Sequence, residues 1–346
     1  MNKQFVMFVI LLIILIAIPI QPTFARATFA ANTTSPQQAD LIIEAFDVNA
    51  SGELAIAYAS GLVEILDNTR ATIYSKDFSL AGSASIRGIA WAPAPRDHLV
   101  AVNVNGSFPD RYVAIWNVST DQVTIVDQAG VSLAFDWNAD GTLLAIIYAT
   151  GISEFFDTDF VAIWDVDNAS VLMRFDEQPE RFSAIAWRAN YDEVAIGTIA
   201  GNIYLWDIDN GLRYNSFAAH TEPILDLSWS PMGDKLATVG SDIVVKTWDQ
   251  PSTNILSALS LASYPSQVLW RPNSSTEVAV VETPYIVVFD ALSGTVITTI
   301  DAHSSRAANM WAVWQVDGSA LLYSAYNTPN QEVTINIAII PTTASR

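Results

Sequence analysis

The spacing of the aromatic residues constrains this chain more than any other feature of its sequence. Seven positions, each at the end of a strand-like segment and before a turn, recur about every 44 residues: Val48, Trp91, Trp137, Trp187, Trp229, Trp270 and Trp314. A second series follows later in the repeats, at Trp116, Trp164, Trp206, Trp248 and Phe289, so ten of the eleven Trp residues occupy repeated positions. Such a period is typical of an array whose units bury their hydrophobic faces against their neighbours.

Within one repeat, the hydrophobic pattern has the period of β-strands. The fifth repeat divides into four strand-like segments, at residues 224–230, 235–239, 243–248 and 255–261. Glycine stands in turns where a tight hairpin requires positive φ, at Gly52, Gly141, Gly211 and Gly318. Val, Ile, Thr and aromatic residues are enriched, and no helical periodicity follows the N-terminal segment. Each repeat therefore predicts four short strands.

These repeats resemble those of the WD-repeat β-propeller family. The likeness is greatest in the fifth unit, in His220-Thr221-Glu222-Pro223-Ile224, Leu227-Ser228-Trp229-Ser230-Pro231-Met232-Gly233, Lys235-Leu236-Ala237-Thr238 and Lys246-Thr247-Trp248-Asp249. The resemblance covers residues 40–340 and implies an all-β fold, a seven-bladed β-propeller of four-stranded antiparallel blades. It also implies a structural tetrad of hydrogen-bonded side chains, His220, Thr238, Asp242 and Trp248, which stabilises a blade and does no chemistry.

Other units depart from the family pattern. Ala200 replaces the Asp of the fourth unit, the first three units lack the His, and the seventh has His303 but no Trp near Ile337. The seventh unit also ends on its third strand. In the resembled family an N-terminal segment supplies the missing outer strand, which here falls near residues 30–37, where Pro36 is tolerated on an outer edge. These departures suit a divergent bacterial, exported relative.

The N-terminal residues have the features of a signal peptide. An uninterrupted apolar run, Phe5–Ile18, follows a short positive start and precedes Ala25-Arg26-Ala27, a small-residue cleavage pattern. We expect the mature chain to begin near Thr28 and to lie outside the cytoplasm, as a secreted, periplasmic or cell-surface protein. Alternatives are a cut after Ala25 or Ala30 and an uncleaved membrane anchor. The expected divisions are a signal peptide (1–27), a linker that can close the ring (28–39), the propeller (40–341) and a tail (342–346).

Composition excludes several classes of function. The chain has 36 acidic and 16 basic residues and a net charge of −20, so it lacks the positive stripe that binding to nucleic acid requires. With no Cys, it has no disulfides, thiolate nucleophiles or Cys-ligated metals. No HExxH, P-loop, GxGxxG or GxSxG context occurs. We interpret His98, His220 and His303 as structural, and we predict no enzymatic activity, metal or cofactor.

Two interpretations of the acidic residues stay open. Asp47, Asp136, Asp226 and Glu44 belong to the innermost strands, where they would serve an exported hydrolase or lyase that uses acids or a metal at the central channel. The turns at residues 165–168 and 207–211 partly resemble calcium loops, although a hairpin turn is needed at both places in any case.

Two neighbouring units have a longer connection between their second and third strands, around Asn103–Arg111 and Tyr148–Phe160. Function is often located in such loops on a rigid scaffold. The predicted partner-binding residues are Phe108, Arg111, Phe155, Phe156, Asp157 and Asp159, with the aromatic side chains as anchors and Arg111 orienting the partner. Phe155 and Phe156 could instead cover an extended hairpin. The expected partner is a protein or an extracellular polymer with a basic face. A membrane is a partner only if the signal peptide stays attached.

Overall fold

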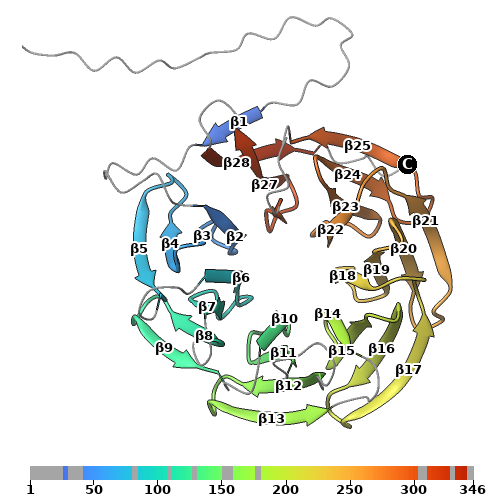
Figure 1. The fold of residues 1–346 in the computed structure, drawn as a ribbon, viewed down its shortest axis with the longest axis horizontal. Coiled ribbons are helices and arrows are strands. Elements are labelled where there is room, and N and C mark those ends of the chain that lie inside the picture. Colours follow the sequence, from blue (N-terminus) through green and yellow to red (C-terminus); the bar gives the residue numbers. More distant parts are fainter. Residues whose placement is uncertain are drawn as a thin grey trace, which may run out of the picture.

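The computed structural model describes residues 26–29, 42–79, 85–106, 111–126, 131–149, 159–175, 181–302, 310–327 and 332–340. Seven four-stranded antiparallel sheets are arranged around a central axis as the blades of a propeller (Figure 1). The all-β, seven-bladed fold predicted from the repeats is therefore confirmed. Within the described ranges, no helix is long and apolar enough to cross a membrane.

Each blade has four strands, named a to d from the centre to the perimeter. The a strands are β2 (Ile43–Val48), β6 (Ser85–Trp91), β10 (Val131–Trp137), β14 (Phe182–Trp187), β18 (Ile224–Trp229), β22 (Pro265–Trp270) and β26 (Ala312–Trp314). The b strands are β3 (Leu54–Tyr58), β7 (Leu99–Asn105), β11 (Leu143–Ala149), β15 (Glu193–Thr198), β19 (Lys235–Gly240), β23 (Glu277–Glu282) and β27 (Ala320–Asn327).

The two outer positions of each blade follow the same order. The c strands are β4 (Leu62–Leu66), β8 (Arg111–Asn117), β12 (Asp159–Asp165), β16 (Asn202–Asp207), β20 (Val244–Asp249), β24 (Tyr285–Asp290) and β28 (Glu332–Ile339). The d strands are β5 (Thr72–Asp77), β9 (Gln122–Ile125), β13 (Ser170–Phe175), β17 (Leu212–Ala218), β21 (Ile255–Ser260), β25 (Val296–Asp301) and, in blade 7, β1 (Arg26–Phe29).

The repeated aromatic positions mark the same place in every blade. All seven residues of the first series are the last residue of an a strand, and all are buried. The second series lies next to the end of the c strands of blades 2 to 6. The hydrophobic core is divided among the interfaces between blades: one cluster combines Val63 and Ile65 of blade 1 with Trp91 and Trp116 of blade 2. The aromatic spacing thus reports the contacts between neighbouring sheets.

A β-bulge interrupts the a strand of blades 1 to 6 at one equivalent position. The register shifts there between strands a and b, four residues before the anchor, and the residues left without a cross-strand partner are Glu44, Arg87, Leu133, Ser183, Leu225 and Ser266. An extra residue increases local strand twist. This bulge was not predicted from the sequence, because the apolar alternation on either side of it looks regular.

The turns between strands a and b pack against the preceding blade. Gly318 has φ +67°, and a Cβ on it would lie 2.5 Å from the carbonyl oxygen of Pro272 in blade 6. Glycine is needed here both for its backbone conformation and for the close approach of two blades. The positive φ values of Gly52, Gly141 and Gly211 agree with the turns predicted from the sequence.

The N-terminal strand closes the ring, but earlier in the chain than expected. β1 pairs antiparallel with β28 as the d strand of blade 7, with Arg26 opposite Ala338 and Phe29 opposite Ile335. The expected segment, 30–37, lies outside the described residues. The expected segment contains Asn32 and Pro36, residue types that are depleted in strands, whereas Arg26–Phe29 contains neither type. On the inner side, the indole of Trp311 in blade 7 donates to the carbonyl of Phe46 in blade 1 (2.8 Å).

The long connections of blades 2 and 3 are partly strand. β7, β8, β11 and β12 have seven residues each, against five or six in the b and c strands of blades 1, 4, 5 and 6. Tyr148 is buried within β11 and stacks on Phe160 of β12 at 5.2 Å, so the expected loop around Tyr148–Phe160 is too wide. Blade 7 also has a long hairpin, with eight residues in each of β27 and β28. The spacing of the aromatic residues did not indicate this long hairpin, because Ile337 occupies the position of the second aromatic anchor.

Candidate functional site

Among the described residues, large apolar side chains are exposed on one face of the disc, and several of them lie over blades 4 to 6. This face, which we call the b–c face, contains the turns between strands b and c and the connections from strand d of one blade to strand a of the next. Ile199 in blade 4, Ile243 in blade 5, and Tyr264 and Tyr285 at blade 6 are 44%, 39%, 56% and 38% exposed, respectively. Large aromatic side chains that remain exposed on a rigid fold are typical of interaction sites.

Hydrogen bonds fix the segment that carries Tyr264 between two blades. Its hydroxyl lies 2.7 Å from the hydroxyl of Ser241, in the b–c turn of blade 5. The hydroxyl of Ser263 donates to the carbonyl of Thr283, in the b–c turn of blade 6 (2.9 Å). The buried carboxylate of Glu282 accepts the backbone N–H groups of Ala262 and Ser263 (2.7 and 3.0 Å). Tyr264 is therefore presented by a preorganised loop, which reduces the entropic cost of binding.

The four residues of the structural tetrad lie in one hydrogen-bonded series in blade 5. Trp248 Nε1–H donates to Thr238 Oγ1 (3.0 Å), which lies 2.8 Å from His220 Nε2, and His220 Nδ1 lies 2.8 Å from Asp242 Oδ1. The series assigns the imidazole tautomer: Nδ1–H donates to the carboxylate, and Nε2 accepts from the threonine hydroxyl. The chain of bonds runs from the b–c face into the blade.

The electrostatics of the tetrad suit a structural role. Burial lowers the pKa of His220, so its imidazole is neutral near pH 7. Partial burial opposes ionisation of Asp242, but hydrogen bonds from His220 and Thr221 outweigh it and lower the pKa of that carboxyl. Gly240 leaves room for the pair, since a Cβ there would lie 2.6 Å from His220 Nδ1. Both ring nitrogens of His220 are engaged, so it is a poor candidate for a general base.

The predicted partner-binding residues are only partly described by the structure. Phe108, Phe155, Phe156 and Asp157 lie outside the described residues, so their role stays a prediction. Arg111 begins β8 at the b–c face and is half-buried, and its Nε–H donates to the carbonyl of Gly106 in the same hairpin (2.9 Å).

Asp159 is a correction to the predicted partner-binding set. It is 1% exposed, and its Oδ2 accepts the backbone N–H of Phe182 in blade 4 (2.8 Å) and lies 3.6 Å from Nε of Arg181. Asp159 therefore connects blades 3 and 4 and does not face a partner. Asp157 and Phe160 lie close to it in the sequence. The sequence alone does not show which acidic side chain of this segment is buried.

The acids of the innermost strands tie neighbouring blades together. Asp47 Oδ2 accepts the backbone N–H of Trp91 in the next blade (2.8 Å), and Asp136 Oδ2 accepts that of Trp187 (2.7 Å). The other oxygen of each carboxylate accepts the N–H of the residue that follows it. Ser228 Oγ makes the equivalent contact with Trp270 N–H (3.0 Å). These three residues all precede an anchor in blades 1, 3 and 5.

Blades 2, 4 and 6 use a different contact at the same position. The residue before the anchor is there Ala90, Ala186 or Leu269, whose side chain accepts no hydrogen bond. Its backbone carbonyl instead accepts the indole N–H of the next anchor, from Trp137, Trp229 and Trp314 respectively, at 3.2 Å in each case. Side-chain and indole contacts thus alternate around the first six blades. The alternation of Asp, Asp and Ser with Ala, Ala and Leu is the sequence signal that could have revealed it.

The pKa values of these acids reflect their burial. Burial raises the pKa of Asp47 to about 7, of Asp136 to about 6 and of Asp226 to about 7, although backbone N–H groups donate to all three. Asp226 Oδ2 accepts Val268 N–H of the next blade (2.8 Å), and Glu44 occupies the bulge of β2. In the described part of the chain, no three His or acidic side chains are grouped so as to hold a metal ion.

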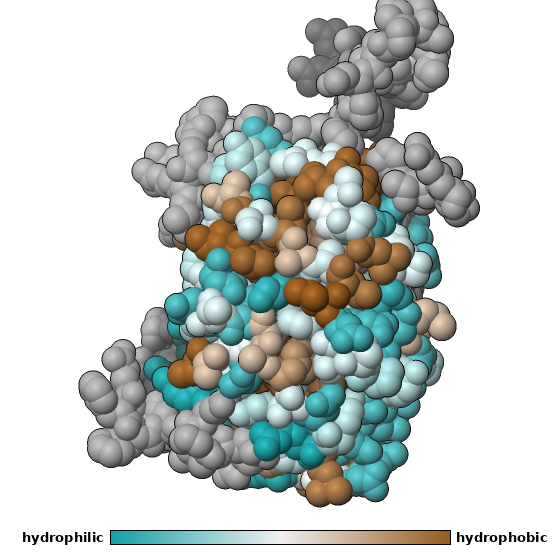
Figure 2. All heavy atoms as spheres, turned by 90° about the vertical axis from the view of Figure 1, so that its right-hand side faces the viewer, coloured by the Kyte–Doolittle hydropathy of each residue, from teal (hydrophilic) through white to brown (hydrophobic). Residues whose placement is uncertain are grey.

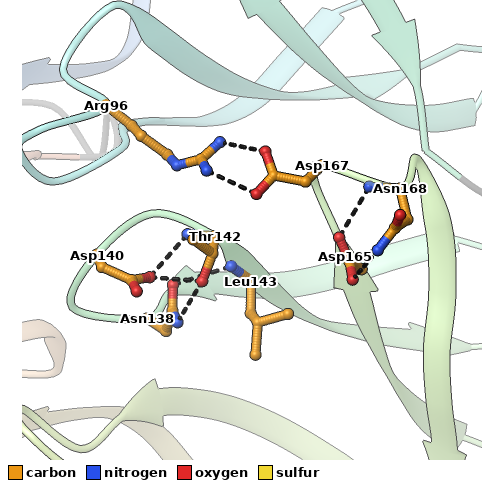
Figure 3. A network of polar contacts seen from close by, with 8 residues as sticks. All are labelled: Arg96, Asn138, Asp140, Thr142, Leu143, Asp165, Asp167 and Asn168. Carbon is orange, nitrogen blue, oxygen red and sulfur yellow. Dashed lines mark hydrogen bonds and ion pairs between the residues drawn. The ribbon is translucent and has the colours of Figure 1, made fainter.

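The two Asp-rich turns bind groups of the chain itself. In blade 3, Asp165 accepts hydrogen bonds from the backbone and side-chain nitrogens of Asn168 (2.9 and 2.8 Å), and Arg96 of blade 2 makes a two-pronged ion pair with Asp167 (2.8 and 2.7 Å; Figure 3). Asp207 and Asn210 repeat the same turn in blade 4. These carboxylates thus stabilise two turns and one contact between blades, all on the face opposite the b–c face.

A second apolar area lies on the perimeter. Figure 2 views the side of the disc where β21 and β25 lie, and hydrophobic side chains gather mainly in its upper half. Ile255 of β21, Leu292 in the turn before β25, and Val296 of β25 are 52%, 47% and 45% exposed, respectively. The c–d turn of blade 6 contacts β21, since the hydroxyl of Ser257 donates to the carbonyl of Ala291 (2.9 Å). The run from residue 250 to residue 270 contains no charged residue.

Comparisons with known proteins agree with this geometry. The family model "WD domain, G-beta repeat" matches residues 211–249, which include the tetrad. A protein of Arabidopsis thaliana, "Cell division cycle 20.6, cofactor of APC complex", is 32% identical over 148 residues, which are 40% of this chain and 31% of that protein. "WD repeat-containing protein slp1" of Schizosaccharomyces pombe is 22% identical over 68% of this chain and 47% of its own length.

A bacterial relative has a similar overlap. "Uncharacterized WD repeat-containing protein sll1491" of Synechocystis is 22% identical over 50% of this chain and 49% of its own length. The matched segments thus span about a third to a half of these relatives. With seven four-stranded blades, repeated buried anchors and a complete tetrad in blade 5, the chain has the fold of a WD-repeat β-propeller and contains a WD repeat at residues 211–249.

Proposed function

We propose that this chain is an exported, non-enzymatic scaffold whose b–c face binds another protein or an extracellular polymer. The observation that carries the proposal is Tyr264, which is 56% exposed and held by a loop bonded to the b–c turns of two blades. Ile199, Ile243 and Tyr285 extend the apolar surface over three adjacent blades. Interfaces of proteins are typically anchored by such rigid aromatic side chains.

The residues that could serve catalysis have structural tasks. Both oxygens of Asp47 and of Asp136 accept backbone N–H groups, and both ring nitrogens of His220 are bonded. These contacts favour a scaffold over an exported hydrolase or lyase that acts at the central channel. The name of the Arabidopsis thaliana relative, which calls it a cofactor of a complex, also describes a binding role. The match covers 31% of that relative, so its complex is not proposed as a partner of this chain.

The chemistry of the partner follows from the charge of the chain. A net charge of −20 steers basic surfaces toward the molecule and repels acidic ones. We therefore propose a partner with a basic face, whose association slows as salt screens the attraction. Phe155 and Phe156 stay predicted anchors. Export rests on the signal-peptide features of residues 1–27 and places the partner outside the cytoplasm.

A pair of site-specific photo-cross-linkers tests this function. One replaces Tyr264 on the b–c face, and the other replaces Met232, which is 66% exposed on the opposite face. Irradiation in the native cell envelope should join a discrete partner to the first variant and not to the second. The same adduct from both positions, or an adduct only from Met232, would assign the partner to another surface. A colorimetric hydrolase screen of the purified protein that finds turnover abolished by Asp136→Asn would support the enzyme instead.

A further inference from the structure

The strand that closes the ring coincides with the end of the predicted signal peptide. β1 consists of Arg26–Phe29, and each of its four residues has a partner in β28. The strand lies at the perimeter of blade 7, where the chain enters the propeller (Figure 1). Signal-peptide processing and ring closure therefore involve the same few residues.

The three candidate cleavage positions affect β1 differently. A cut after Ala25 keeps all four residues of the strand. A cut after Ala27, where the small-residue pattern fits best, removes Arg26 and Ala27 and leaves two paired residues. A cut after Ala30 removes the strand completely. The choice of cleavage site thus decides whether blade 7 has three or four strands.

A propeller without β1 would have an exposed edge of unusual length. β28 has eight residues, and Glu332 is its only charged residue. An exposed, mostly apolar strand of this length offers a row of unpaired N–H and C=O groups to any other chain. Ring closure by β1 also connects the beginning of the propeller to its end, which hinders separation of blades 1 and 7. Retention of β1 is therefore favoured by stability and by solubility.

We infer that processing occurs at the Ala25–Arg26 bond, so that the mature chain begins at Arg26 and keeps β1. The inference rests on the export in the proposed function. It differs from the Thr28 terminus expected from the sequence, because the cleavage pattern alone takes no account of the strand that follows it. The ring-closing strand is then the first segment of the mature protein.

The N-terminus of the exported protein is the direct test. The full-length chain with its own leader is expressed in an exporting bacterial host, and the exported fraction is analysed by intact mass and N-terminal sequencing. We expect Arg26 as the first residue. A mature chain that begins at Thr28 or Ala31 would overturn the inference while export stands. An exported chain that retains Met1 would overturn the cleavage and indicate an uncleaved anchor. Absence of the chain from the exported fraction would overturn the export in the proposed function.

A disulfide reporter tests whether β1 is in place in the exported protein. Thr28 lies opposite Asn336 in the register, a separation that a disulfide can bridge, and the chain has no other Cys. The Thr28→Cys/Asn336→Cys variant should form an internal disulfide under mild oxidation. The matched Thr28→Cys/Thr334→Cys variant, displaced by two residues, should stay largely reduced. Free thiols in both variants, or loss of residue 28 from the mature chain, would contradict the retained strand.

Discussion

Thr238 connects the indole of Trp248 to the imidazole of His220 in the core of blade 5. Its hydroxyl oxygen accepts from the Trp248 indole and its proton is directed at His220, and the side chain is fully buried. Blade 4 shows what happens without it. Ile196 occupies the equivalent position of β15, and the indole N–H of Trp206 has no hydrogen-bond partner among the described residues. Two anchors of the same type thus differ in their polar contact.

This difference allows a matched test of the tetrad. Trp248→Phe should lower the free energy of unfolding by about 1–3 kcal/mol, because it leaves a buried acceptor on Thr238 without a donor. Trp206→Phe should cost less, since its indole makes no such bond. Chemical denaturation of both variants gives the comparison. Equal losses would mean that ring size alone matters and that the tetrad contributes nothing measurable.

The outer strands differ in how they are protected from pairing with another chain. β5, β13, β17 and β25 contain a charged residue, and β9 directly follows Asp121. β21 has no charged residue within it or within five residues of either end. It begins with the exposed Ile255 and contacts the c–d turn of blade 6, which contains the exposed Leu292. Charged side chains on an edge strand discourage intermolecular pairing. β21 is therefore the outer strand at which self-association is expected.

A single lysine tests this expectation. Ser260→Lys places a charge on the exposed end of β21 and should reduce the fraction of dimers and aggregates on heating or concentration. Ser216→Lys is the control, because it lies exposed on β17, which already contains Arg213. Light scattering at increasing protein concentration measures both. Equal suppression by the two variants would attribute the effect to net charge, and no suppression would place self-association elsewhere.

How far the elements could be predicted depends on what specifies each of them. The strands follow from local alternation, turn glycines and a repeated anchor such as Trp229, all of which are visible along the chain. The inter-blade contacts, for example Asp136 with Trp187, join residues about 50 positions apart, and their partner is a backbone group with no sequence signature. Tyr264 was missed because its exposure depends on how two neighbouring blades hold its loop. Asp159 was misplaced for the same reason.

The ring as a whole depends on carboxyl groups that are shared between blades. Asp47, Asp136 and Asp226 hold backbone N–H groups of the following blade, and all three have a raised pKa. Each folded-state pKa lies above the ordinary value of 3.8, so the folded chain retains protons that the unfolded chain releases between about pH 4 and pH 7. Their contribution to stability is therefore lost as the pH rises through this range.

The stability of the propeller should consequently decrease between about pH 5 and about pH 8. Burial lowers the pKa of His220, so the titration of this side chain makes stability rise with pH. This effect involves one proton, whereas the opposite effect of the three aspartates involves three. Urea midpoints at the two pH values measure the difference. Asp136→Asn should reduce the decrease, because it removes one of the three titrating groups. A midpoint that stays constant or rises in the unmodified protein would show that these carboxyls are ionised throughout.

The b–c face is the surface to which the proposed function assigns the partner, and its affinity for the protein captured through Tyr264 is the decisive measurement. The Tyr264→Ala/Tyr285→Ala variant should bind that partner at least about tenfold more weakly, equivalent to about 1.4 kcal/mol, with an unchanged unfolding midpoint. Met232→Ala, on the opposite face, should bind within about twofold of the unmodified chain. Undiminished binding by the double variant, together with a loss in Met232→Ala, would contradict the assignment.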